Sequence, residues 1–151
     1  MKKIFLVGFL VLVLIVAGCS QPQKTPNPNN GDKITVYKSP SCGCCGGYVA
    51  DLGKNGFDVE VIETANMASV KEKYNIPRSM ESCHTSIIGD YFIEGHVPIE
   101  AVNKLLEEQP DIDGIALPRM TAGSPGMPGT KQEPWKIYAL TDGKTSEFMT
   151  I

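Results

Sequence analysis

The chain of 151 residues lacks any run of basic residues, and its formal net charge is −3. Nucleic-acid-binding domains carry clustered lysine and arginine, so this composition argues against a nucleic-acid partner. The sequence also lacks an apolar run of the length, about 20 residues, that spans a bilayer. The N-terminal run that begins at Ile4 covers only about 14 residues. A simple transmembrane anchor is therefore the weaker interpretation of this segment.

The N-terminal segment has the layout of a secretory signal peptide, because the basic Lys2 and Lys3 precede the apolar run. Ala17 and Gly18 stand directly before Cys19, and this arrangement resembles a bacterial lipobox. The resemblance implies cleavage before Cys19 and a lipid such as palmitate on its sulfur. Two or more acyl chains give stable membrane anchoring. We therefore expect residues 1–18 to be a lipoprotein signal peptide.

The residues after Cys19 are polar and rich in proline and asparagine up to Asp32, with nothing apolar to bury. Residues 19–32 are therefore expected to be the lipidated cysteine and a polar tether, and residues 33–151 the globular domain. Loss of residues 1–18 would leave 133 residues, and loss of their two lysines would move the formal charge from −3 to −5. The expected product is exported and anchored at the bacterial membrane, facing outside the cytoplasm.

The apolar patterns predict an α/β domain of thioredoxin-like order, β-α-β-α-β-β-α. Its expected strands and helices cover residues 34–37, 48–53, 57–62, 66–75, 84–88, 91–94 and 99–109. Four prolines, four glycines and two methionines predict a long loop over residues 114–134. Residues 135–151 read as a final hairpin that turns at Asp142-Gly143. A thioredoxin-like domain places its active cysteines where the first strand meets the first helix.

Five cysteines are encoded, and four remain if Cys19 carries lipid. In an oxidising compartment four cysteines suggest two disulfides. Three of them, Cys42, Cys44 and Cys45, are crowded together, and only Cys42–Cys45 with Cys44–Cys83 avoids a strained ring. A chain of this size can bury a core without such staples. The crowding therefore favours a reactive or metal-binding role for these cysteines over two structural disulfides.

Cys42 and Cys45 form a C-x-x-C pair of the thioredoxin type, and Cys44 is a third thiol inside it. If a helix starts here, its N-terminus lowers the pKa of these thiols. A thiol-exchange enzyme gains nothing obvious from the extra cysteine. A third thiolate makes more sense as a metal ligand, because its sulfur can bridge between soft ions.

Cys83 and His84 precede the third expected strand, in a loop that faces the start of the first helix in a thioredoxin-like fold. His96, the other histidine of the chain, follows the expected hairpin, and Met120 and Met127 lie in the long loop. A lone histidine is usually a surface or capping residue, and a loop methionine usually packs. Thiolate, imidazole and thioether together are nevertheless the ligands of copper(I), whereas zinc has little use for methionine.

Four separated motifs resemble the CopG-type copper resistance proteins, a thioredoxin-like family formerly catalogued as a domain of unknown function. They are Val36-Tyr37-Lys38-Ser39-Pro40-Ser41-Cys42-Gly43-Cys44-Cys45-Gly46, Ser82-Cys83-His84-Thr85, Glu94-Gly95-His96-Val97-Pro98 and Gly123-Ser124-Pro125-Gly126-Met127. The resemblance covers roughly residues 33–150. It implies a cysteine-bridged site for more than one copper ion, with possible interconversion of copper(I) and copper(II). Family members are commonly soluble periplasmic proteins, so a lipid anchor would be a departure.

Carried to the matching positions, the resemblance implies a copper site on Cys42, Cys44, Cys45 and Cys83, with His84, His96 and Met127 as weaker candidates. Whether the protein is an enzyme, a copper oxidoreductase, stays open at this point. Its expected partners are copper ions, the membrane through the lipid, and other copper-handling proteins of the envelope. Two alternatives stand beside this prediction: a membrane-anchored thiol–disulfide oxidoreductase using Cys42 and Cys45, and a zinc-binding module.

Overall fold

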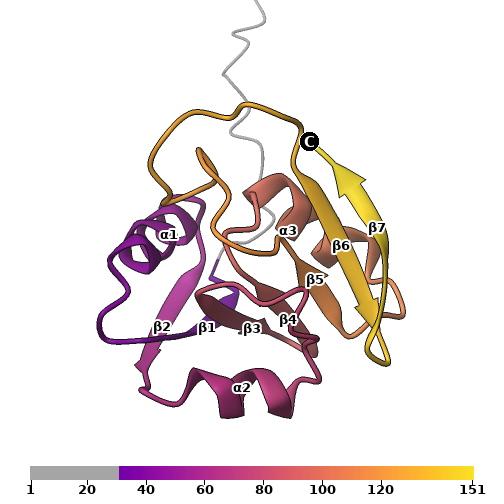
Figure 1. Cartoon of the computed structure of the whole chain (residues 1–151), viewed down its shortest axis with the longest axis horizontal. Coiled ribbons are helices and arrows are strands. Elements are labelled where there is room, and N and C mark those ends of the chain that lie inside the picture. Colours follow the sequence, from indigo (N-terminus) through magenta and orange to yellow (C-terminus); the bar gives the residue numbers. More distant parts are fainter. Residues whose placement is uncertain (1–30) are drawn as a thin grey trace, which may run out of the picture.

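The computed structural model describes residues 31–151 (Figure 1). The expected signal peptide, the lipid on Cys19 and most of the tether lie outside the described residues. The last two tether residues, Gly31 and Asp32, are hydrogen-bonded to the domain. The N–H of Gly31 donates to the carbonyl of Gly56 at 3.1 Å, and the carbonyl of Asp32 accepts from the N–H of Asp58 at 3.0 Å. Between residues 31 and 151, no helix is long and apolar enough to cross a membrane.

Helices and strands alternate in the first half of the domain, and strands dominate its end (Figure 1). The elements are β1 (Lys33–Lys38), α1 (Gly43–Lys54), β2 (Asp58–Glu63), α2 (Met67–Lys73), β3 (His84–Ile88), β4 (Tyr91–Glu94), α3 (Ile99–Glu108), β5 (Gly114–Ala116), β6 (Lys136–Thr141) and β7 (Lys144–Thr150). The order of the first seven agrees with the order predicted from the apolar patterns.

All strands join one sheet in the order β2-β1-β3-β4-β5-β6-β7. The pairs β1–β2 and β4–β5 are parallel, and the other neighbours are antiparallel. The thioredoxin-like α/β prediction is confirmed, and the C-terminal hairpin β6–β7 extends the sheet at one edge. That hairpin turns at Asp142 and Gly143, both of which have positive φ, as expected for this type of turn.

The predicted loop over residues 114–134 begins three residues too early. Gly114–Ala116 is strand β5, which is fully buried between β4 and β6 and connects the C-terminal hairpin to the central sheet. A strand of three residues gives too few positions for an apolar alternation to be recognised. The loop itself runs from Leu117 to Trp135.

Each face of the sheet is covered by different helices. Tyr48 and Leu52 of α1 and Val102 and Leu105 of α3 share one core cluster with Ile93 of the sheet. The adjacent Phe92 points to the opposite face, where it packs in a second cluster with Ile76, just after α2. Helix α1 is therefore packed against the main core, and this packing fixes the position of its first turn.

The second helix differs from its sequence pattern. Met67, Val70 and Tyr74 have the spacing of one face of a helix, and each of them is only partly buried. The residue of α2 that is buried is Lys71, with 5% of its surface exposed. It is buried because Glu94 of β4 supplies a buried partner for its charge.

Two segments far apart in the sequence meet where α1 begins. Lys38, the last residue of β1, pairs with His84, the first residue of β3, so the turn into α1 and the residue before β3 lie at the same edge. The loop between β5 and β6 arches over to α1 (Figure 1). A Cβ built on Gly47 would lie 2.8 Å from the Cα of Gly126, so the two backbones are in direct contact.

Candidate metal centre

The first turn of α1 carries three of the four cysteines of the domain. Cys42 is the N-cap, with extended backbone angles, and Cys44 and Cys45 lie in the first turn. The side chain of Cys42 makes no capping hydrogen bond, and the turn contains no acidic residue. The free N–H groups and the dipole of this helix end favour negative charge on the sulfurs.

In the structure Cys42 and Cys45 form a disulfide, and Cys44 and Cys83 are free thiols. Of the two disulfides that the sequence allowed, one is therefore formed. Cys45 is fully buried, whereas Cys42 and Cys44 are half-buried. The structure thus describes an oxidised form, in which two of the four candidate ligands are bonded to each other.

Cys83 completes the sulfur cluster from the other side of the sequence. Its Sγ lies 3.7 Å from Sγ of Cys45 and 3.9 Å from Sγ of Cys44. Sγ of Cys44 lies in turn 3.6 Å from Sγ of Cys42. All four sulfurs lie within 4.8 Å of one another. The expected meeting of the Cys83 loop with the start of the first helix is present in the fold.

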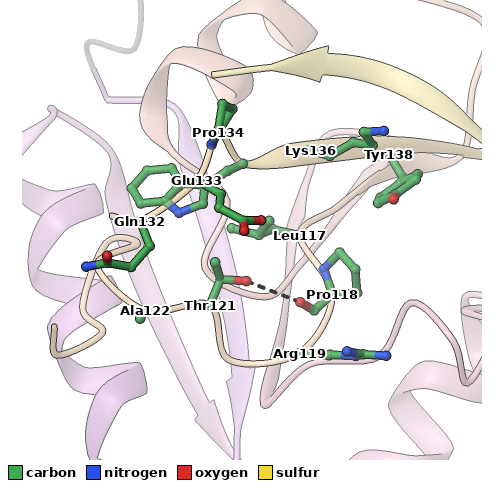
Figure 2. Close-up of a pocket in the computed structure, with 11 residues that line it drawn as sticks. Leu117, Pro118, Arg119, Thr121, Ala122, Gln132, Glu133, Pro134, Lys136 and Tyr138 are labelled. Atoms are coloured by element: carbon green, nitrogen blue, oxygen red, sulfur yellow. Dashed lines mark hydrogen bonds between the residues drawn. The ribbon is translucent and has the colours of Figure 1, made fainter. Parts of the chain in front are cut away.

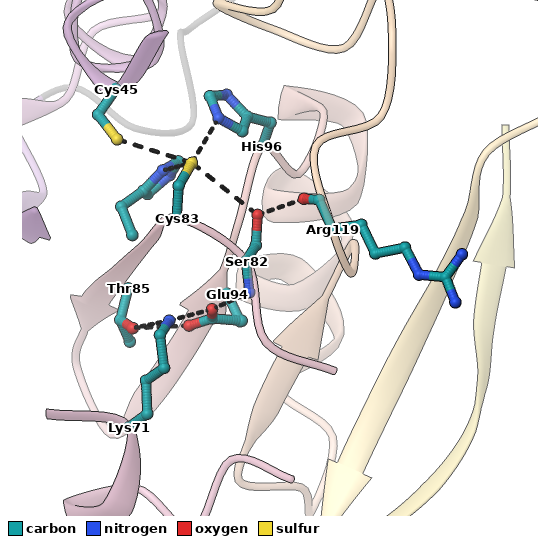
Figure 3. A network of polar contacts seen from close by, with 9 residues as sticks. Cys45, Lys71, Ser82, Cys83, Thr85, Glu94, His96 and Arg119 are labelled. Carbon is teal, nitrogen blue, oxygen red and sulfur yellow. Dashed lines mark hydrogen bonds and ion pairs between the residues drawn. The ribbon is translucent and has the colours of Figure 1, made fainter. Parts of the chain in front are cut away.

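Both histidines of the chain adjoin the same cysteine. Nε2 of His96 lies 3.0 Å from Sγ of Cys83, and Nδ1 of His84 lies 3.6 Å from it (Figure 3). These three side chains also place their ligand atoms within 4.8 Å of one another. Cys83 therefore belongs both to the group of four sulfurs and to a group with two imidazoles.

The backbone fixes how His96 faces the cluster. Its Nδ1 lies 2.7 Å from the carbonyl oxygen of Pro125, which can only accept a hydrogen bond. Nδ1 therefore carries the proton and donates, and Nε2 presents its lone pair to Cys83. An imidazole held in this way through its other nitrogen is the usual arrangement of a metal-ligating histidine.

Burial favours the uncharged forms of His84, His96 and Cys83 in the metal-free protein. Burial, the nearby His96 and the charge of Lys71 lower the pKa of His84 to about 3, and burial also lowers the pKa of His96. Burial and the neighbouring Cys44 raise the pKa of the Cys83 thiol to about 11. Neutral imidazole is the form that binds metals, and a bound cation displaces the proton from a coordinating thiol.

The long loop between β5 and β6 covers the first turn of α1. Gly126 has a φ of 79°, and a Cβ there would lie 2.4 Å from the N of Tyr48 and 2.8 Å from the carbonyl oxygen of Cys44. The next residue, Met127, is half-buried, and its N–H donates to the carbonyl of Ser124 at 2.8 Å. Met127 thus directly follows Gly126, which contacts helix α1. Coordination of a metal ion by the Met127 thioether is a proposal.

Met120, the other methionine of the long loop, is 61% exposed. It lines a hollow of about 450 Å³ together with Arg78, Glu81, Ser82, Cys83 and Arg119. A separate hollow of about 460 Å³ lies between the long loop and β6 (Figure 2). Its lining includes Trp135 and Tyr138 but no cysteine, histidine or methionine, so it offers no soft ligand.

Sequence reasoning missed the polar network that holds Cys83 in place (Figure 3). The fully buried carboxylate of Glu94 accepts hydrogen bonds from the ammonium of Lys71, from the N–H of Ser82 at 2.6 Å and from the hydroxyl of Thr85 at 2.6 Å. The Ser82 hydroxyl donates to the carbonyl of Arg119. The residues on both sides of Cys83 are thereby fixed to β4. The only sequence signal was a glutamate at the end of an apolar strand.

The fold and the site together define a class: an α/β domain of thioredoxin-like topology in which a C-x-C-C turn, a fourth cysteine and two histidines lie close enough together to hold a soft metal ion. A family model described as "Protein of unknown function, DUF411" matches residues 80–127. Two solved structures, named Copper resistance protein copG, Form 2 and Form 1, are each 40% identical to this chain and superpose with a TM-score of 0.73. They cover 79% of this chain and 97% and 96% of their own. No curated protein matches.

The chain belongs to the CopG family of copper resistance proteins. This membership confirms the resemblance that the four sequence motifs indicated.

Proposed function

We propose that this protein binds copper at the Cys42, Cys44, Cys45 and Cys83 cluster and serves copper resistance. The observation that carries the proposal is the position of Cys83, whose sulfur is within 4 Å of two other cysteine sulfurs and of both histidines. Thiolate and imidazole together suit copper(I). The CopG name of the 40% identical relatives supports copper over zinc.

The number of sulfurs favours more than one ion. Four sulfurs within 4.8 Å of one another exceed what a single copper(I) ion needs, and thiolates bridge readily between soft ions. Cys44 is the sulfur in excess of a thioredoxin-type pair, and it contacts both Cys42 and Cys83. We assign it the bridging role, with His84, His96 and Met127 as further ligand candidates.

Redox activity toward copper extends the same proposal. The formation of one disulfide from two thiols releases two electrons, enough to reduce two copper(II) ions to copper(I). Cys42 and Cys45 are close enough to make that disulfide. Only the reduced protein would then offer all four thiolates to copper.

The proposed location is a bacterial membrane, with the domain facing outside the cytoplasm and Cys19 lipidated after removal of residues 1–18. The support is the lipobox-like sequence alone. Radiolabelled palmitate incorporation, compared with a Cys19→Ser variant, tests it: equal labelling of the two proteins would contradict the assignment.

An anaerobic titration of the reduced protein with copper(I) tests the main proposal. We expect several copper ions per chain, absorption from thiolate-to-copper charge transfer, and no displacement by zinc. The Cys44→Ser variant should bind fewer ions. A protein that binds copper no more tightly than its thiol-blocked form would refute copper binding.

A second function is favoured by the Cys42–Cys45 disulfide itself. The pair sits at the N-terminus of α1, as in thiol–disulfide oxidoreductases. That activity predicts reduction of insulin disulfides, and the Cys44→Ser variant should retain it. If the natural protein reduces insulin but does not bind copper, the oxidoreductase function replaces the copper proposal.

A further inference from the structure

The free thiol of Cys83 lies against the disulfide of the same site. Its Sγ is 3.7 Å from Sγ of Cys45, which is bonded to Cys42 (Figure 3). This is a contact distance for two sulfurs. Disulfides exchange when a thiolate attacks one of their sulfurs, so the structure places a nucleophile beside its target.

His96 supplies a proton acceptor for that nucleophile. Because Nδ1 of His96 donates to the carbonyl of Pro125, the unprotonated Nε2 faces Sγ of Cys83 at 3.0 Å. The thiol of Cys83 therefore donates its hydrogen bond to Nε2. Burial keeps the resting Cys83 thiol protonated, so its proton must leave as the new sulfur–sulfur bond forms, and Nε2 of His96 is placed to accept it.

Cys44, the other free thiol, is a poor competitor. Its Sγ lies 3.6 Å from Sγ of Cys42. A bond between those two cysteines, or between Cys44 and the adjacent Cys45, would close a strained ring. Cys83 is 38 positions from Cys45 and has no such restriction. Cys83 is thus the nucleophile and Cys45 the shared sulfur.

We infer that the oxidised protein moves its disulfide from Cys42–Cys45 to Cys45–Cys83. Sγ of Cys83 attacks Sγ of Cys45, a Cys45–Cys83 bond forms, and the Cys42–Cys45 bond breaks with its electron pair on Sγ of Cys42. The proton of Cys83 passes to Nε2 of His96, and the Cys42 thiolate takes up one proton in return. One disulfide replaces another, so no oxidant or reductant is consumed.

The exchange changes what the site presents to its surroundings. In the first form, the bond lies within one helical turn and Cys42 is blocked. In the second form, the bond joins α1 to the residue before β3, through the fully buried Cys45. The half-buried Cys42 and Cys44 are then both free thiols. The oxidised protein thereby switches between a closed form and a form that displays two thiols to a soft metal or a substrate disulfide.

Peptide mapping of the oxidised, metal-free, full-length protein tests the exchange. Trypsin separates residues 39–54, which carry Cys42, Cys44 and Cys45, from residues 79–104, which carry Cys83. After free thiols are blocked with N-ethylmaleimide, we expect the two peptides to be disulfide-linked in roughly a tenth or more of the molecules, a free-energy gap of at most about 1.4 kcal/mol. Recovery of the Cys83 peptide only in blocked, unlinked form would overturn the inference.

The Cys44→Ser variant is the matched control for the identity of the bond. The linked peptides should persist in it at a similar yield, because Cys44 takes no part. Their disappearance would mean that Cys44 was the partner of Cys83 and would overturn the assignment of Cys45.

Alkylation of the native oxidised protein with iodoacetamide follows the same exchange in time. Cys42 should become alkylated as Cys45–Cys83 forms, and the His96→Gln variant should slow this at least roughly tenfold. Alkylation of Cys44 in the same peptide is the internal control and should keep its rate. Equal rates at Cys42 in the two proteins would overturn the part given to His96. These measurements need no copper, so the copper proposal and the exchange can fail separately.

Discussion

Nε2 of His96 lies 3.0 Å from Sγ of Cys83, and the carbonyl of Pro125 holds the same ring from its other nitrogen at 2.7 Å. One imidazole thus connects the loop after β4, the residue before β3 and the long loop over α1. These contacts place a neutral imidazole nitrogen directly beside the sulfur of Cys83.

The His96→Gln variant should bind copper(I) more weakly than the natural protein. The substitution removes the imidazole next to Cys83, and comparable losses around metal sites cost roughly tenfold to a hundredfold in affinity. Competition with a copper(I) chelator under anaerobic conditions measures the difference. Gln132→Ala, an exposed change in the same long loop, is the control. Equal affinity of His96→Gln and the natural protein would remove His96 from the proposed site.

Gly46 and Gly47 are neighbours in α1, but their replacement by alanine should have opposite effects. A Cβ on Gly46 meets nothing within 4 Å, so Gly46→Ala should stabilise the helix by about 1 kcal/mol through helix propensity. A Cβ on Gly47 would lie 2.8 Å from the Cα of Gly126, and overpacking of this kind costs about 1–3 kcal/mol. Urea unfolding of the two variants checks the signs. Stabilisation by both changes would show that the long loop does not rest on α1.

The sequence predicted most elements because their signals are local. The two strands over residues 84–88 and 91–94 and the helix that begins at residue 99 are predicted from neighbouring positions, and these predictions are confirmed. The crowding of Cys42, Cys44 and Cys45 is equally local. Strand β5 was missed because three residues carry too little pattern, and only their pairing with β4 and β6 makes them a strand.

The supports of the site could not be predicted because they depend on contacts between distant residues. A lysine in a short amphipathic helix normally faces water, and nothing near Lys71 in sequence indicates that Glu94 lies opposite it. The Pro125 carbonyl is likewise a backbone atom in a loop with no periodic pattern. Residue types indicated which groups carry the chemistry, but the fold determines which of them contact one another.

The buried pair of Lys71 and Glu94 should contribute far more to stability than the exposed pair of Lys104 and Glu108. Lys71→Met leaves the Glu94 carboxylate without its partner in a site with no exposed surface, and breaking such a pair costs about 3–5 kcal/mol. Lys104→Met breaks a pair whose side chains are 33% and 53% exposed, and should cost less than about 1 kcal/mol. Chemical denaturation of both variants gives the comparison.

The Lys71→Met/Glu94→Gln double variant separates loss of the charge partner from loss of packing. It removes the unpaired carboxylate, so it should regain part of the stability that Lys71→Met loses. If Lys71→Met were no more destabilising than Lys104→Met, the network could not be what holds the Cys83 segment.

His84 should make the metal-free protein sensitive to acid. Histidine in an unfolded chain titrates near pH 6.5, whereas burial, His96 and Lys71 lower the pKa of folded His84 to about 3. The unfolded state therefore binds the proton more readily. The stabilising contribution is complete above about pH 6.5 and is lost progressively as the pH falls toward about 3. A shift of this size corresponds to about 5 kcal/mol for a side chain with no exposed surface.

Urea unfolding of the metal-free oxidised protein between pH 7 and pH 4 measures this loss. His84→Asn replaces the ring with a group that does not titrate, so its stability should fall less steeply over the same range. The difference between the two slopes isolates His84 from the carboxylates, which titrate in both proteins. Parallel slopes would mean that His84 is protonated in the folded state at these pH values. That result would contradict the burial of a neutral His84 ring in the metal-free protein.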